Sequence, residues 1–86
     1  MYRLEIEDKV DKIFSKMKNR IRLEMINKKI QQILENPDRF KPLRSKMSGL
    51  REVHIDKSFV LLYAIDEPRK IVRIVDFDHH DNIFRH

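Results

Sequence analysis

Three apolar runs in the second half of the chain decide its fold. They read GLREVHI (49–55), FVLLY (59–63) and IVRIVDF (71–77), and HHDNIF (79–84) follows them. Runs of about 4–8 apolar or alternating residues are typical of β-strands. The connections between the runs are so short that they predict antiparallel hairpins. We therefore expect neighbouring strands at about 51–56, 59–65 and 71–77.

The first 36 residues predict one strand and two helices. Tyr2, Leu4 and Ile6 alternate with polar residues, as in a strand. Asp8 offers an N-cap for a first helix, with Asp11 in a capping-box position. After an interruption at Asn19 and Arg20, a second helix is expected from about Arg20 to Glu35, because Pro37 disfavours helical geometry before it. The residues expected to be buried by the two helices are Val10, Ile13, Phe14, Met17, Leu23, Ile26, Ile30, Ile33 and Leu34.

These elements predict an α+β fold in the order βααβββ. Two N-terminal helices would cover one face of a small, mainly antiparallel sheet, because an apolar sheet face must be buried against something. Eighty-six residues allow one domain, 1–86, with a small core. The chain has no cysteine and no apolar run long enough to span a membrane, so we expect a protein of the reducing cytoplasm.

The charge distribution is compatible with an anionic partner. Nineteen Lys and Arg against fourteen Asp and Glu give a net charge of +5. The densest cluster is Arg39, Lys41, Arg44 and Lys46, with no acidic residue among them. Such a cluster suits a polyanion or an acidic protein, although a solvated loop is an alternative.

The residues that could carry chemistry lie on the first predicted strand of the meander. Side chains alternate across a strand, so Glu52 and His54 share one face and Val53 and Ile55 the other. If the helices cover Val53 and Ile55, then Glu52 and His54 point to an open face, about 7 Å apart along it. A phosphodiester could reach both side chains. Alternatively, Glu52 pairs with Arg51 or Lys57 and plays no part in chemistry.

The last segment adds a second imidazole beside an aromatic ring. His80 and Phe84 fall on the same side whether the segment is a strand or a helical turn. Histidine can transfer a proton near neutral pH, and a phenyl ring can stack on a nucleotide base. A surface histidine without a role and a Phe that only fills the core are the alternatives. No spacing of metal ligands, glycine-rich phosphate loop or nucleophile motif is present.

With these motifs, the chain resembles the RelE/ParE superfamily of toxins from type II toxin–antitoxin modules. The likeness extends over the whole chain and is greatest to the YafQ-like branch. The segments that carry it are Lys41–Leu43, Gly49–Ile55 and Leu61–Tyr63, with His80 and Phe84 at the end. Three positions common in these relatives differ: Lys41 replaces a histidine, Ser58 an aspartate and Val60 an arginine.

The resemblance implies a metal-independent ribonuclease that cleaves messenger RNA on the ribosome. Glu52, His54, His80 and Phe84 match functional positions of the family. In the resulting hypothesis the ribose 2′-hydroxyl attacks the adjacent phosphate, with His54 or Glu52 as base and His80 as acid.

Cations would complete this site. Arg51, Lys57 and Lys41 would stabilise the negative charge that develops on the phosphate. Arg44 and Lys46 would position the RNA backbone. No cofactor is expected.

The resemblance also implies a partner, a RelB-like antitoxin with acidic and amphipathic segments, in a heterotetramer or larger assembly. Two alternative functions remain open. ParE relatives inhibit DNA gyrase by binding it, and a non-catalytic module that binds RNA or the ribosome would use the same fold.

Overall fold

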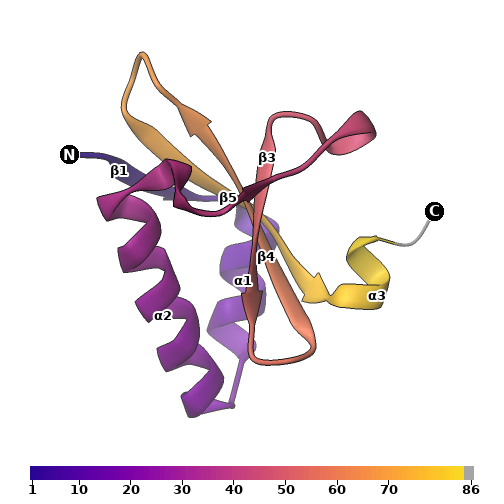
Figure 1. The fold of residues 1–86 in the computed structure, drawn as a ribbon. Coiled ribbons are helices and arrows are strands. Elements are labelled where there is room, and N and C mark those ends of the chain that lie inside the picture. Colours follow the sequence, from indigo (N-terminus) through magenta and orange to yellow (C-terminus); the bar gives the residue numbers. More distant parts are fainter. Residues whose placement is uncertain (85–86) are drawn as a thin grey trace.

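The first strand of this protein pairs with the last one. The computed structural model describes residues 1–84, and within them the strands form a five-stranded sheet in the order β1-β5-β4-β3-β2 (Figure 1). The strands are β1 (Arg3–Ile6), β2 (Lys41–Pro42), β3 (Leu50–Ile55), β4 (Phe59–Asp66) and β5 (Ile71–His79). β1 pairs with β5 in parallel and the other neighbours are antiparallel. The sheet is therefore mixed, with the predicted antiparallel meander at its centre.

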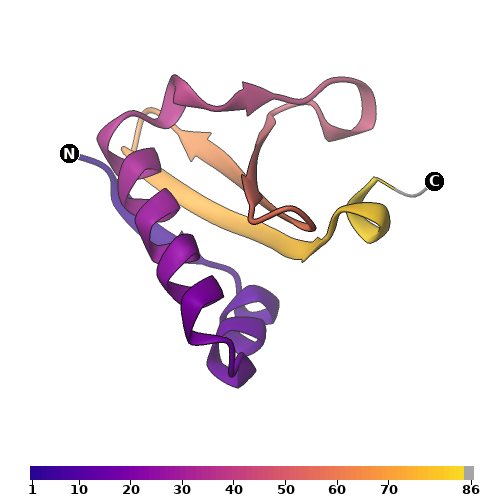
Figure 2. The same ribbon diagram turned by 60° about the horizontal axis from the view of Figure 1, so that its bottom comes forward.

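Two helices cover one face of the sheet. They are α1 (Asp8–Lys16) and α2 (Arg20–Glu35), which lie together below the sheet in Figure 2. The core between the layers includes Val10, Ile26 and Ile33 from the helices and Val53 and Leu61 from the sheet. This arrangement confirms the predicted α+β fold with two N-terminal helices on one face. No helix among residues 1–84 is both long and apolar enough to cross a membrane.

The start of α1 differs from the prediction, whereas α2 begins at Arg20 as predicted. The N-cap of α1 is Glu7 rather than Asp8, and its side chain makes no capping hydrogen bond. Asp8 and Asp11 lie instead in the first helical turn, where carboxylates interact favourably with the helix dipole. Asn19 caps α2, because its side-chain oxygen accepts the Arg22 N–H at 2.9 Å.

The predicted buried set is only partly correct. Val10, Ile26, Ile30 and Ile33 are buried, whereas Phe14, Met17, Leu23 and Leu34 are half-buried. Ile13 is 37% exposed, because α1 contacts the sheet mainly through β5 and leaves its other side to solvent.

The second face of the sheet carries its own small apolar cluster. Val60 and Leu62 of β4 pack there with Ile83 of α3 (His80–Ile83), the short helix after β5. Leu43, Met47, Leu50, Val75 and Phe84 pack against them. The segment that carries the basic cluster is partly ordered into β2 and two short 3-10 turns, Pro37–Arg39 and Ser45–Met47.

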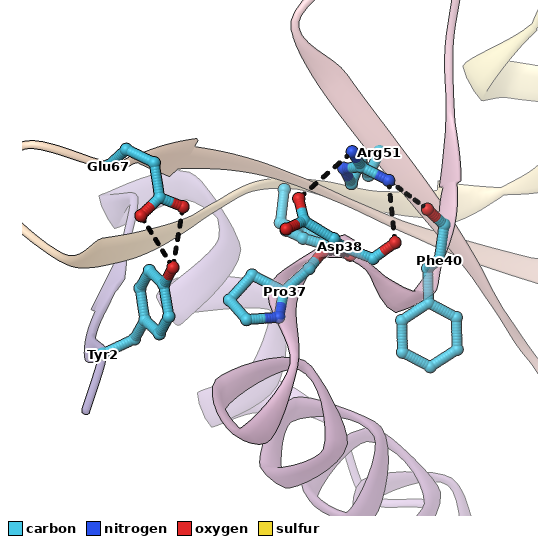
Figure 3. A network of polar contacts seen from close by, with 7 residues as sticks. Tyr2, Pro37, Asp38, Phe40, Arg51 and Glu67 are labelled. Carbon is cyan, nitrogen blue, oxygen red and sulfur yellow. Dashed lines mark hydrogen bonds and ion pairs between the residues drawn. The ribbon is translucent and has the colours of Figure 1, made fainter.

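Hydrogen bonds from Tyr63 and Arg51 fix the Pro37–Phe40 segment to the sheet, and Figure 3 shows those of Arg51. Tyr63 is fully buried and its hydroxyl donates to the Pro37 carbonyl at 2.6 Å. The Arg51 guanidinium donates to the carbonyls of Asp38 and Phe40 at 3.1 and 2.6 Å. These bonds place β2 beside β3 at the edge of the sheet.

We predict that Tyr63→Phe lowers the free energy of unfolding by about 1–2 kcal/mol at pH 7, because the Pro37 carbonyl loses its donor. Burial raises the pKa of Tyr63 to about 12. The neutral phenol therefore stabilises the fold fully below pH 10, the usual tyrosine pKa, and this contribution is lost as the pH rises towards 12. Urea unfolding of the wild type and of Tyr63→Phe, at pH 7 and at pH 11.5, measures the difference in their free energies of unfolding.

The loss of unfolding free energy caused by Tyr63→Phe should therefore be smaller at pH 11.5 than at pH 7. Tyr2→Phe is the matched control, since the Tyr2 hydroxyl bonds the exposed carboxylate of Glu67 and its loss should have a smaller effect. A penalty for Tyr63→Phe that stays constant with pH would contradict the role of the buried hydroxyl.

Candidate functional site

The pairing of β3 with β4 sorts the residues of β3 between the two faces of the sheet. Glu52 lies opposite Leu62 and His54 opposite Val60, so both belong to the face away from α1 and α2. The predicted common face of Glu52 and His54 is therefore confirmed. That face is not open at Glu52, whose side chain is only 9% exposed. Glu52 is shielded because it lies between Leu62 of β4 and Lys41 of β2.

The turn between β3 and β4 holds the start of α3. The Asp56 side chain accepts the Ser58 N–H at 2.8 Å, and Asp56 has a positive φ of 47°. This hydrogen bond, together with Arg22, lowers the pKa of the Asp56 carboxyl. The Ser58 carbonyl then accepts the backbone N–H of His80 at 2.7 Å. His80 is thereby fixed beside the end of β3.

Local bonds also shape the short helix itself. His79 is its N-cap, and its Nδ1 accepts the Asp81 N–H at 3.2 Å. The Asp78 carboxylate accepts the His79 N–H and the Asn82 side-chain N–H at 2.7 and 3.2 Å. The last segment is therefore a helical turn, which decides between the two conformations that the sequence left open.

The structure brings the predicted histidines together. The rings of His54 and His80 are stacked, with centroids 6.0 Å apart and planes inclined by 22°. On one side, Glu52 Oε1 lies 3.6 Å from His54 Nε2. On the other, the ring of Phe84 lies 4.9 Å from that of His80. Glu52, His54, His80 and Phe84 thus form one continuous row, although they come from β3 and from the end of the chain.

The two histidine side chains of this row are exposed enough to contact a ligand. The side chains of His54 and His80 are 55% and 50% exposed, whereas Glu52 is buried behind them. Hollows lie on both sides of the histidine pair. One, of about 560 Å³, is lined by His80, Asp81, Asn82 and Phe84. The other, of about 440 Å³, is lined by Lys29, Arg39, Phe40, Lys41, Glu52, Val53 and His54.

Most of the predicted cations surround this row without being neutralised. Lys41 lies directly opposite Glu52 in the β2–β3 pair. Arg44 and Lys46 line a third hollow, of about 380 Å³, together with Phe84. Lys57 is exposed in the β3–β4 turn. Within residues 1–84, none of these four cations has a carboxylate within 4 Å.

Arg51 is placed differently from the other predicted cations. It lies opposite Tyr63, on the helix-covered face, and its guanidinium is occupied by Asp38 and by the carbonyls of Asp38 and Phe40 (Figure 3). The two-residue period of β3 places it on the other face from Glu52 and His54. The geometry gives Arg51 a structural role in holding the Pro37–Phe40 segment.

Sequence reasoning missed Lys29 and Phe40 as neighbours of the site, and it named Arg39 only as a member of the basic cluster. Lys29 of α2, Arg39 and Phe40 line the hollow that contains Glu52 and His54. The only local signal was that Phe40 stands between two cations, and Lys29 comes from a helix interpreted as scaffold. Within residues 1–84, no group of three or more His, Asp or Glu residues is placed to hold a metal ion.

The fold is that of a small toxin of the RelE/ParE class. A sequence model of the family described as "ParE toxin of type II toxin-antitoxin system, parDE" matches residues 2–84. The chain therefore belongs to this family, and the predicted RelE/ParE membership is confirmed. It is a toxin of the RelE/ParE type from a type II toxin–antitoxin system.

Individual relatives agree with this membership. The chain is 47% identical over 87 residues to the protein named "Putative toxin RelE4" of Methanocaldococcus jannaschii, covering 99% of this chain and 93% of that protein. The toxin–antitoxin complex RelBE2 of Mycobacterium tuberculosis contains a similar chain, with a TM-score of 0.76 and 25% identity, covering 92% of this chain and 98% of that one.

YafQ of Escherichia coli shares the fold. Its TM-score is 0.73 at 17% identity, covering 98% of this chain and 99% of that one. Its TM-score and sequence identity are lower than those for the RelBE2 chain, so the greater likeness to the YafQ-like branch stays a prediction.

We predict that Arg51→Gln lowers the free energy of unfolding by about 1.5–3 kcal/mol, because charge-assisted bonds to two backbone carbonyls are lost. Lys57→Gln, which removes a cation without any such bonds, should change it by no more than about 0.5 kcal/mol. Urea unfolding of both variants tests this contrast. An Arg51→Gln protein as stable as the wild type but unable to bind RNA would instead place Arg51 in the functional site.

Proposed function

We propose that this toxin is an endoribonuclease that cleaves messenger RNA without a metal ion and thereby inhibits translation, with the ribosome presenting the RNA. The observation that carries this proposal is the stacked pair of accessible histidines, His54 and His80, between buried Glu52 and the Phe84 ring. Two groups that transfer protons near neutral pH, adjacent to each other and open to a ligand, are what a metal-free phosphate transesterification requires.

The reaction would proceed by attack of the ribose 2′-oxygen on the adjacent phosphorus. His54 takes the 2′-hydroxyl proton as the new P–O bond forms. The bond to the 5′-oxygen breaks, and His80 gives its proton to that oxygen. The products are a 2′,3′-cyclic phosphate and a 5′-hydroxyl, so protons and charge balance between the two histidines.

The remaining residues of the row support these roles. Glu52 lies 3.6 Å from His54 Nε2 and is almost completely shielded, so it can orient the imidazole and stabilise its protonated form. Lys41 lies opposite Glu52 and can offset the charge that develops on the phosphate. Arg44, Lys46 and Lys57 would hold flanking phosphates, and Phe84 would stack on a base. Arg51 is left out of this mechanism because it lies on the helix-covered face, where its guanidinium bonds the Pro37–Phe40 segment.

The partner of the toxin would be a RelB-like antitoxin with acidic and amphipathic helices, in a heterotetramer or larger assembly. Support comes from the similar chain in the RelBE2 toxin–antitoxin complex. Ile13 and Ile21 on the helices are 37% and 72% exposed, which suits an amphipathic partner helix. The acidic residues of such a partner would neutralise the unpaired cations. Toxin and target would meet in the cytoplasm, where messenger RNA is translated.

One observation favours a second candidate. The matching family model is that of ParE toxins, so inhibition of DNA gyrase by binding remains the alternative, and fold alone does not separate the two activities. A non-catalytic module that binds RNA or the ribosome is the further alternative. Both would operate without proton transfer by His54 and His80.

We predict that His54→Ala and His80→Ala each reduce RNA cleavage by about 10²–10⁴-fold, the usual contribution of a positioned acid or base. His79→Asn is the matched control. It removes an adjacent imidazole but keeps a side-chain acceptor for the N-cap of α3, so activity should stay within a few-fold. Rates are measured on ribosomes programmed with a defined messenger, and an RNA with a 2′-deoxy target nucleotide should remain intact.

Growth and RNA ends after brief expression in cells decide between the candidates. A nuclease leaves discrete cuts within translated frames, and both alanine variants lose toxicity. Intact transcripts with broken chromosomes, and toxicity that survives both substitutions, would establish the gyrase alternative. Cleavage of the 2′-deoxy RNA would contradict the proposed chemistry.

A further inference from the structure

We propose that the hollow formed by Lys29, Arg39, Phe40 and Lys41 is a second nucleotide subsite. It would hold the nucleotide on one side of the phosphate at His54 and His80, while Phe84 holds the nucleotide on the other side. This inference rests on the proposed ribonuclease function and extends it, because it assigns a ligand to Lys29, Arg39 and Phe40, which the mechanism does not use.

The hollow is continuous with the catalytic row. Its lining includes Glu52 and His54 themselves as well as Lys41, which lies opposite Glu52. It has a volume of about 440 Å³, within the usual range of small-molecule sites. It adjoins β3 where β2, of only two residues, no longer covers the edge. A strand of RNA that leaves the histidine pair on the side away from Phe84 would enter this space.

One aromatic ring and its cations give the hollow the composition of a nucleotide site. Phe40 is half-buried against the main core, and its accessible part lines the hollow. Lys29 Nζ and the Arg39 guanidinium carbon each lie 5.6 Å from the centre of its ring. Single-stranded nucleic acids are bound by such combinations, in which bases stack on aromatic rings and cations hold phosphates.

Lys29 and Arg39 are available for a ligand, whereas Arg22, which also lies near an aromatic ring, is not. Arg22 lies 4.2 Å from the centre of the Phe59 ring and is also paired with Asp56 at 3.0 Å, so its interactions are used within the fold. Among residues 1–84, neither Lys29 nor Arg39 has a carboxylate within 4 Å. Both lie at a longer distance from their ring, from which the flexible side chains can turn to a phosphate.

The two aromatic rings on either side of the histidines favour RNA over an acidic protein segment as the occupant. An acidic segment would need the cations, but not a ring on each side of a proton-transfer pair. Phe84 next to His80, and Phe40 in the hollow of His54, would bracket one phosphodiester with two stacked bases. Cleavage between two held nucleotides requires this positioning of the phosphate.

The test uses the full chain and a short single-stranded RNA with one 2′-deoxy nucleotide at the cleavage position. The fluorescent base 2-aminopurine is placed before or after this nucleotide, and binding is followed by anisotropy and by quenching. Phe40→Leu should weaken binding by about 5- to 100-fold and restore fluorescence at one of the two positions. Phe84→Leu should restore it at the other position.

Substitutions that remove a single charge test the subsite even if Phe40→Leu disturbs the core. Lys29→Gln and Arg39→Gln should each weaken binding and reduce the slope of log affinity against log salt by about 0.7, as expected for one lost phosphate contact. Lys28→Gln and Arg20→Gln are the matched controls, since they remove exposed cations outside the hollow. Both should leave binding and the salt slope unchanged.

The outcomes separate this subsite from the proposed function. If the wild type cleaves unmodified RNA but Phe40, Lys29 and Arg39 variants bind and cleave as it does, the subsite is overturned and the nuclease stands. If the chain binds RNA through these residues but never cleaves it, the nuclease fails and the subsite stands. If RNA does not bind, or if these variants affect only the binding of an acidic antitoxin peptide, the subsite is overturned.

Discussion

The two-residue period of β3 is the constraint on which the rest of the structure depends. It sends Arg51, Val53 and Ile55 to the helix-covered face and Glu52 and His54 to the other. A shift of the register by one residue would bury the carboxylate and imidazole in the main core and expose Val53 and Ile55. Because Val53 and Ile55 are almost completely buried, the free energy of core packing also fixes the orientation of the functional residues.

The second apolar cluster explains how a short C-terminal helix can take part in a precise site. Ile83 is buried against Val60 and Leu62, and Phe84 is half-buried beside them. Together with the bond from the His80 N–H to the Ser58 carbonyl, this packing fixes His80 next to His54. A four-residue helix would not be stable alone in water, since isolated helices need about 12–15 residues. Its position therefore depends on these tertiary contacts, and so does the geometry of the histidine pair.

Much of this architecture could be predicted because its signals are local. The bounds of α2, Arg20–Glu35, follow from apolar spacing and Pro37, and the three meander strands follow from apolar runs and short turns. Alternation placed Glu52 and His54 on one face, and a four-residue spacing placed His80 beside Phe84. That the two pairs meet was an expectation from family resemblance, and the structure shows that they do.

The features that could not be predicted depend on contacts distant in the sequence. β2 has only two residues, one of them a proline, and exists because Leu43 and Leu50 pair across a turn in which Ser45 and Gly49 have positive φ. The burial of Glu52 and the use of Arg51 by the Pro37–Phe40 segment both follow from that strand. The hollow around Phe40 likewise combines a helix, a turn and a strand edge, so no single segment reveals it.

The central claim is that His54 and His80 exchange protons with the RNA, and the pH dependence of cleavage tests it most directly. Single-turnover rates on programmed ribosomes, measured from pH 5 to pH 9, should follow a bell-shaped curve, since one histidine must be neutral and the other protonated. Residual cleavage by His54→Ala should lack the acidic limb, and that by His80→Ala the alkaline limb. A rate that does not vary with pH, or both limbs persisting in both variants, would contradict the assignment of this pair.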